Sequence, residues 1–273
     1  MAHILQVGVG SGGMPVLDMV SREEHVTEVT IIEPDVYEEH NVHRHMFARS
    51  HVGRRKVELA QEWLQARRPE LHVHILPCDV CDPASQSNVE AAVQAADLGI
   101  CAVDNEPAKY HWDALMRRFG KPWTLGEVLS GGIGGFVHWF IPGGACYGCV
   151  ASRLQRVEVD KTGSPDYSQP GGAVHETRIP APKAAIEAVA SLHALVTLEL
   201  LANPDGFDLG FTTLLWSLQQ VPDVFEEPFR PHRFQIRRSE KCLVCGTDSD
   251  YSEKSPEELD VALDKALARL GDE

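Results

Sequence analysis

The chain has 273 residues, of which 43% are hydrophobic, enough to bury one large core or two modest ones. Acidic residues number 40 against 25 basic ones, so the formal net charge is −15. That charge repels a phosphate backbone and argues against nucleic-acid binding. No stretch is typical of a signal peptide or of an uninterrupted apolar membrane span, which predicts a soluble, cytoplasmic protein.

Strands and helices alternate along the first half of the chain. Residues 3–9 form an apolar strand that leads into a glycine-rich run at 8–13 and a helix at 14–20. The pattern continues with a strand at 26–33, a helix at 53–67, a strand at 72–76, a helix at 88–96, a strand at 98–103, a helix at 110–119 and a strand at 122–129. This alternation predicts a Rossmann-like α/β fold with a mainly parallel sheet and flanking helices.

The second half predicts fewer regular elements. A glycine-rich turn at 131–135 precedes an apolar run at 136–141, and a strongly apolar helix covers 182–202. Two later segments, 211–219 and 233–237, predict the strands of a smaller C-terminal sheet.

Two Cys-x-x-Cys motifs, Cys146/Cys149 and Cys242/Cys245, predict a metal site. Two such pairs complete the four-sulfur shell of a structural zinc ion, and Gly148 and Gly246 would supply the tight turns. Because the pairs lie far apart in the sequence, zinc would tie a C-terminal segment to the middle of the chain and add to the folding energy. The alternatives are unrelated cysteines or disulfides.

A third pair, Cys78 and Cys81, has the same spacing. It has no second pair with which to complete a shell, so we interpret these residues as loop cysteines.

The glycine run alone fits dehydrogenases, methyltransferases and adenylating enzymes. The next loop is more specific, because residues 33–45 resemble the Asp-x-Asp-x-Val-x-x-Ser-Asn-Leu-x-Arg-Gln signature of the ThiF/MoeB/HesA family, bacterial relatives of ubiquitin-activating enzymes. The glycine loop with its trailing proline at 8–16, a Gly-x-x-Lys helix start at 53–56, an acidic strand end at 103–105 and the two zinc motifs follow in the family's order.

The resemblance implies an enzyme that uses ATP and Mg²⁺ to convert the C-terminal carboxylate of a ubiquitin-like protein or peptide into an acyl adenylate, with release of pyrophosphate. Attack on the α-phosphate needs cations around the phosphates and a carboxylate that holds magnesium. By resemblance, Arg44 and Lys56 supply the cations and Asp104 the magnesium ligand. The other nucleotide-binding residues implied are Gly8, Gly10, Gly13, Glu33 at the ribose, Asp35 and Asn41. The implied partners are a protein or peptide with a free C-terminal glycine and a second copy of this chain.

The same resemblance implies an adenylation domain over residues 1–252. Turn-forming residues predict a mobile loop near 158–178, and a capping box followed by regularly spaced leucines predicts an amphipathic helix over 253–273. Many family members carry a further cysteine in that loop, and this chain has none between Cys149 and Cys242. We therefore expect adenylation without a thioester on the loop. His45 stands where glutamine is usual, and Lys109 where arginine is common.

Three other functions fit parts of the pattern. The chain could be an inert scaffold subunit that keeps the fold and the zinc site, or it could adenylate a transfer-RNA base, which its acidic charge disfavours. An NAD-linked oxidoreductase would explain the glycine run but not Arg44, Lys56 or the four cysteines.

Overall fold

The computed structural model describes residues 1–154, 181–204 and 206–246. Contacts divide the chain into two compact units, residues 1–142 with 156–235, and residues 143–155 with 236–273. The predicted mobile loop at 158–178 and the predicted helix at 253–273 lie outside the described residues.

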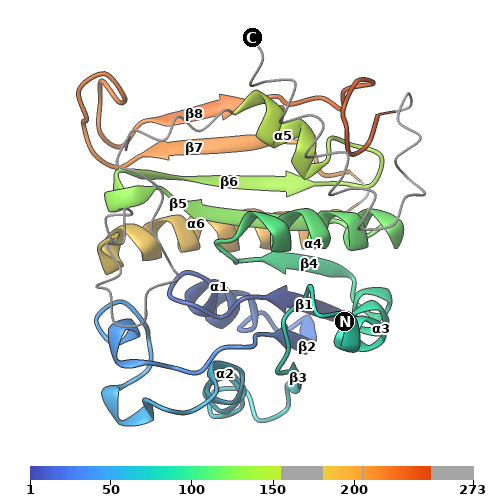
Figure 1. Cartoon of the computed structure of the whole chain (residues 1–273), viewed down its shortest axis with the longest axis vertical. Coiled ribbons are helices and arrows are strands. Elements are labelled where there is room, and N and C mark those ends of the chain that lie inside the picture. Colours follow the sequence, from blue (N-terminus) through green and yellow to red (C-terminus); the bar gives the residue numbers. More distant parts are fainter. Residues whose placement is uncertain (155–180, 205, 247–273) are drawn as a thin grey trace, which may run out of the picture. The chain divides into compact units, whose positions relative to one another are not determined.

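The first unit is built on one eight-stranded sheet, in the order β3-β2-β1-β4-β5-β6-β7-β8 (Figure 1). Neighbours from β3 to β5 are parallel, and those from β5 to β8 are antiparallel. The strands are β1 (Ala2–Val7), β2 (Val26–Ile32), β3 (His72–Leu76), β4 (Leu98–Cys101), β5 (Trp123–Val128), β6 (Gly134–Phe140), β7 (Thr213–Ser217) and β8 (Pro231–Phe234).

The last two strands differ from the expectation of a separate smaller sheet, because β7 and β8 continue the main sheet. The glycine-rich turn explains this. Gly131 and Gly132 have φ values of 70° and 68°, a region that favours glycine, and the turn sends β6 back antiparallel to β5. The free edge of β6 then pairs with β7.

Helices cover both faces of the sheet. A β-carbon on Gly99 of β4 would lie 2.9 Å from Trp112, whereas one on Gly126 of β5 would lie 2.5 Å from His193. Gly99 pairs with Trp123, so these two residues face the same side of the sheet. Gly126 lies three residues further along β5, and because side chains alternate along a strand it faces the opposite side. Figure 1 accordingly shows α4 in front of the sheet and α6 behind it. The helices of this unit are α1 (Gly13–Val20), α2 (Lys56–Gln65), α3 (Gln86–Ala95), α4 (Glu106–Arg118) and α6 (Lys183–Ala202), with short 3₁₀ turns at Glu39–Asn41, Arg49–His51, Pro83–Ser85 and Ser130–Gly132.

Helix α6 is, within the described part of the chain, the one helix long and apolar enough to cross a membrane. Half of its most apolar stretch is buried, and the helix packs on α1, β5 and β6. This is how the central helix of an α/β core behaves, and its apolar composition follows from that burial.

Two helix starts differ from the sequence expectation for local reasons. Helix α2 begins at Lys56 rather than at residue 53, because Gly53 has a φ of 94°. Helix α4 begins at Glu106 rather than at residue 110, because the side chain of Asn105 accepts a hydrogen bond from the backbone N–H of Ala108 and caps the first turn.

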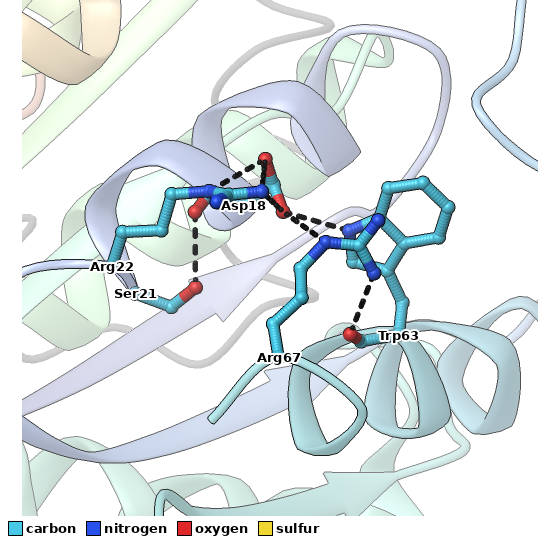
Figure 2. A network of polar contacts seen from close by, with 5 residues as sticks. All are labelled: Asp18, Ser21, Arg22, Trp63 and Arg67. Atoms are coloured by element: carbon cyan, nitrogen blue, oxygen red, sulfur yellow. Dashed lines mark hydrogen bonds and ion pairs between the residues drawn. The ribbon is translucent and has the colours of Figure 1, made fainter. Parts of the chain in front are cut away.

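A buried carboxylate links α1 to α2 (Figure 2). Asp18 accepts a hydrogen bond of 2.7 Å from Nε1 of Trp63, and it also accepts hydrogen bonds from Arg22, which follows the C-terminal end of α1. The guanidinium of Arg67 lies 3.6 Å from Asp18 and stacks 3.5 Å from the centre of the Trp63 ring. This network holds together the two helices that follow the glycine loop and the signature loop.

Candidate nucleotide site and four-cysteine cluster

The glycine loop between β1 and α1 is closed tightly on itself. Gly8 has a φ of 88°, and a β-carbon there would lie 2.6 Å from the carbonyl oxygen of Ala102. A β-carbon on Gly13 would lie 2.3 Å from the carbonyl oxygen of Gly8, so neither position accepts a side chain. Around Gly10 there is open space, which leaves the backbone of the loop accessible to a ligand at that point.

Glu33 follows β2, and its carboxylate binds the glycine loop. Oε2 accepts a hydrogen bond of 2.8 Å from the backbone N–H of Val9, and Oε1 accepts one of 3.0 Å from Asp35. Burial raises the pKa of Glu33, against the lowering effect of Lys56 and of the two N–H donors. Glu33 was predicted to bind ribose; here Oε2 already binds the glycine loop and Oε1 the backbone of Asp35, although each oxygen keeps further acceptor capacity.

His45 holds the other side of Val9. Its Nε2 lies 3.0 Å from the Val9 carbonyl oxygen, and its Nδ1 lies 3.0 Å from the backbone nitrogen of Met46. A carbonyl only accepts and an N–H only donates, so Nε2 carries the proton and the ring is neutral. Burial lowers the pKa of His45 to about 4, and the charges of Lys56, Lys183 and Arg44 also oppose protonation. The ring stacks on Phe47 at 4.4 Å.

Arg44 and Lys56, the two predicted cations, both lie close enough to His45 to affect its protonation. The Lys56 side chain is 9% exposed, and its Nζ donates a hydrogen bond of 2.7 Å to Asp35. Arg44 is half-buried, and its Nε is a buried donor with no hydrogen-bond partner among the described residues. A buried guanidinium N–H without an acceptor is unfavourable, so this atom is suited to an anionic ligand.

A small polar cavity of about 150 Å³ lies beside the Lys56–Asp35 pair. Small-molecule sites usually measure roughly 300–1,000 Å³, so the cavity has room for only a part of a nucleotide. Asn41 lines it, but its side chain accepts from the backbone of Glu38 and thereby also fixes the loop. The lining residues are Asp35, Val36, Glu38, His40, Asn41 and Lys56.

Asp104 lies in the segment between β4 and α4, at the carboxyl end of the parallel strands. Its side chain is exposed and makes no hydrogen bond or ion pair within the part of the chain that the structure describes. Mg²⁺ is usually held by one or two carboxylates together with substrate phosphates, so an uncommitted carboxylate here fits that ion. Lys109, which stands where arginine is common in the family, is 1% exposed and forms ion pairs with Glu106 and Glu127.

The four predicted zinc ligands come together in the second unit, and their Sγ atoms all lie within 4.8 Å of one another. The separations are 3.8 Å for Cys146–Cys149, 3.6 Å for Cys146–Cys242 and 3.4 Å for Cys149–Cys245. A tetrahedral site with Zn–S bonds of about 2.3 Å places sulfurs about 3.8 Å apart, so the cluster fits zinc. All seven cysteines are free, which is against the disulfide alternative.

The glycines beside the cysteines are needed for a different reason from the one predicted. Gly148 lies inside helix α5 (Tyr147–Arg153) rather than in a tight turn, and a β-carbon there would lie 2.6 Å from Val244. A β-carbon on Gly246 would lie 2.3 Å from the carbonyl oxygen of Glu240. Gly148 thus allows the two cysteine segments to approach closely, whereas Gly246 allows its own segment to fold back on Glu240 and Cys242. The backbone N–H groups of Ser239 and Val244 also point to the sulfurs of Cys149 and Cys242.

Lys183, the third cation near His45, is not among the residues that the sequence motifs predicted for the site. One signal was available: a lysine in the first turn of the predicted helix at 182–202 opposes the helix dipole.

Comparison with known proteins gives consistent matches. The model of a family described as the ThiF family matches residues 1–242. The sulfur carrier protein adenylyltransferase of Thermus thermophilus is 28% identical over 258 residues, which cover 92% of this chain and 85% of that protein. The SAMP-activating enzyme E1 of Haloferax volcanii is 27% identical over 150 residues, or 55% of this chain and 53% of that protein.

Among solved structures, E. coli MccB, also solved with ATP and with MccA peptides, has a similar fold. The complex with MccA-N7isoASN superimposes with a TM-score of 0.67 over 90% of this chain and 67% of MccB, at 19% identity. At that identity the likeness concerns the fold alone.

Proposed function

Because the chain belongs to the ThiF family, we propose that it is an ATP-dependent adenylating enzyme that activates the C-terminal carboxylate of a sulfur carrier or ubiquitin-like protein. The observation that carries the proposal is the buried Nε of Arg44, which has no acceptor among the described residues. Arg44 belongs with Lys56 and Lys183 to the cation group, the three cations whose charges act on His45. A phosphate oxygen would supply that acceptor.

The reaction breaks one bond and forms one. A carboxylate oxygen of the substrate attacks the α-phosphorus of ATP, the bond to the β-phosphate breaks, and pyrophosphate leaves with the electron pair. Negative charge builds up on the phosphates, and fixed cations in a partly buried site stabilise it most. Arg44 and Lys56 would supply those cations, and the N–H groups of the glycine loop would bind phosphate or ribose.

Asp104 would hold magnesium together with phosphate oxygens, and the bound ion would neutralise part of the phosphate charge. Asp35, now paired with Lys56, is 61% exposed and could turn to the nucleotide once phosphate takes its place beside the ammonium. Glu33 would bind the ribose only with the acceptor capacity that its two backbone hydrogen bonds leave free.

We further propose that the adenylate passes directly to an external nucleophile or sulfur donor. Residues 150–241 contain no cysteine, so no thiolate from that stretch is available to form a thioester. The four-cysteine cluster would hold zinc as a structural ion, because four thiolates leave no open position for a substrate.

The natural partner in this proposal is a small protein whose chain ends in a free glycine, and the enzyme would act as a homodimer in the cytoplasm. A reducing compartment suits a protein whose seven cysteines are all free. Light scattering on the purified protein would measure the oligomeric state.

ATP–pyrophosphate exchange tests the proposal. Exchange in the presence of magnesium should depend on a protein or peptide with a free C-terminal glycine, and Arg44→Ala should abolish it. Arg49→Ala is the matched control, because Arg49 lies in the same loop, is 73% exposed and pairs with Glu39. An exchange rate that is the same in Arg44→Ala and in the wild type would refute the proposed site, and ATP binding without exchange for any carboxylate would favour the inert scaffold.

A further inference from the structure

Lys183 is an unusual lysine. It is the first residue of α6, directly after the N-cap residue Pro182, and the first turn of α6 has no acidic residue. The side chain is 39% exposed, yet its Nζ is buried, with Glu187 one turn along α6 as an ion-pair partner at 2.5 Å. Lysines normally bury the aliphatic stem and keep the ammonium in water, so this arrangement is reversed.

This arrangement is electrostatically unfavourable in the free protein. The N-terminus of a helix carries about half a positive charge, and a cation placed there adds to it. Glu187 offsets only part of that charge. A buried ammonium at the positive end of a helix is therefore suited to a ligand with more than one negative charge.

The first turn of α6 lies next to the glycine loop. Ile186 lies 3.8 Å from the position that a β-carbon would take on Gly12, and α6 packs along α1. The charges of Lys183, Lys56 and Arg44 all act on the buried ring of His45. His45 ends the signature loop at residues 33–45, and its Nε2 lies against the carbonyl oxygen of Val9. Three cations from three separate segments therefore contribute positive charge at His45, whose ring contacts the glycine loop at Val9.

We propose that Lys183 is a third phosphate-binding cation of the nucleotide site, which exchanges Glu187 for a phosphate oxygen of ATP when the nucleotide binds. This inference rests on the proposed function, because it assigns a further residue to that site. Helix α6 would thereby contribute directly to nucleotide binding in addition to its place in the core.

Nucleotide binding measured by calorimetry tests the role without any catalytic turnover. Lys183→Ala should weaken ATP binding about tenfold, since a charge-assisted hydrogen bond is lost, and should leave the binding of adenosine, which has no phosphate, unchanged. Glu187→Gln should bind ATP as tightly as the wild type or more tightly, because it frees the ammonium. Arg118→Ala controls for the change in net charge, because Arg118 is 64% exposed on α4, on the other face of the sheet, and should have no effect.

Two outcomes would overturn the inference. Unchanged ATP affinity in Lys183→Ala would show that the ammonium does not contact phosphate. An equal loss of affinity for ATP and adenosine would show that Lys183 supports the fold of the site and does not bind phosphate. Failure of the wild type to bind ATP would refute the proposed function itself, which separates the two failures.

Discussion

The Nε2 of His45 lies 3.0 Å from the carbonyl oxygen of Val9, whose own N–H binds Glu33. The backbone N–H and the carbonyl oxygen of Val9 are thus both fixed by side chains from the segment 33–45. A loop held in this way keeps its N–H groups oriented before the ligand arrives, which reduces the entropy lost on binding.

His45→Gln and His45→Ala should therefore differ. Glutamine can donate to Val9 and accept from Met46, so it should retain most of the stability and nucleotide affinity. Alanine leaves the Val9 carbonyl unsatisfied and a cavity beside Phe47, and should lower the free energy of unfolding by about 2–3 kcal/mol. Urea denaturation and ATP titration of the two variants would measure this. Equal behaviour of the two variants would contradict the role of the hydrogen bond.

Acid should destabilise the protein through His45. The pKa of His45 is lowered to about 4 in the fold, against about 6.5 in the unfolded chain. Above pH 6.5 the ring is neutral in both states and contributes no pH dependence. Between pH 6.5 and 4 only the unfolded state takes up the proton, so the free energy of unfolding should fall, by on the order of 3 kcal/mol in total from this group.

Buried His193, with its pKa lowered to about 3, acts in the same direction. Denaturation curves at a series of pH values should therefore show a smaller decline for His45→Gln than for the wild type, but not its complete loss. An unchanged slope in His45→Gln would mean that the fold does not lower the pKa of His45.

Asp104→Ala should abolish adenylation without changing stability. The side chain is exposed and has no partner among the described residues, so its removal should leave the melting temperature and the zinc content unchanged. Pyrophosphate exchange should fall by at least about a hundredfold if the carboxylate holds magnesium. Full activity in Asp104→Ala would refute the magnesium assignment.

Cys242→Ser should release zinc and lower the melting temperature. Four cysteine sulfurs from the two segments of the second unit converge, and a zinc ion bound by them as thiolates would add its binding energy to folding, which the loss of one ligand would reduce. Elemental analysis should find about one zinc per chain in the wild type and less in the variant. Cys78→Ser is the control, because Cys78 lies outside the cluster, and an equal loss of zinc there would contradict the assignment.

Asp18→Ala should loosen the contact between α1 and α2. Asp18 accepts hydrogen bonds from Arg22 and Trp63, and its removal leaves the partly buried Trp63 N–H without its acceptor (Figure 2). We expect a loss of about 1–3 kcal/mol in the free energy of unfolding, measured by denaturation. Glu62→Gln, which changes only the solvent-exposed pair with Arg54, should have little effect, and the prediction fails if the two variants are equally stable.

The alternation of strands and helices predicted most elements of the parallel half to within a few residues. The period of apolar residues fixes which segments bury which face, and this information is local. The same applies to the cysteine motifs, whose spacing already defines two ligand pairs.

The sequence by itself determined the Rossmann-like order of elements and the two Cys-x-x-Cys pairs, because hydrophobic periodicity and cysteine spacing are local. Arg44 and Lys56 remain predictions that rest on the resemblance of motifs. Only the tertiary structure decided that β7 and β8 join the main sheet, that His45 and Glu33 hold opposite sides of Val9, and that Lys183 lies in the same cation group. Apart from the pairing of β8 with β7, these relationships join residues separated by 24 to more than 100 positions. Such pairings arise from sheet pairing and the burial of α6, which no local pattern encodes.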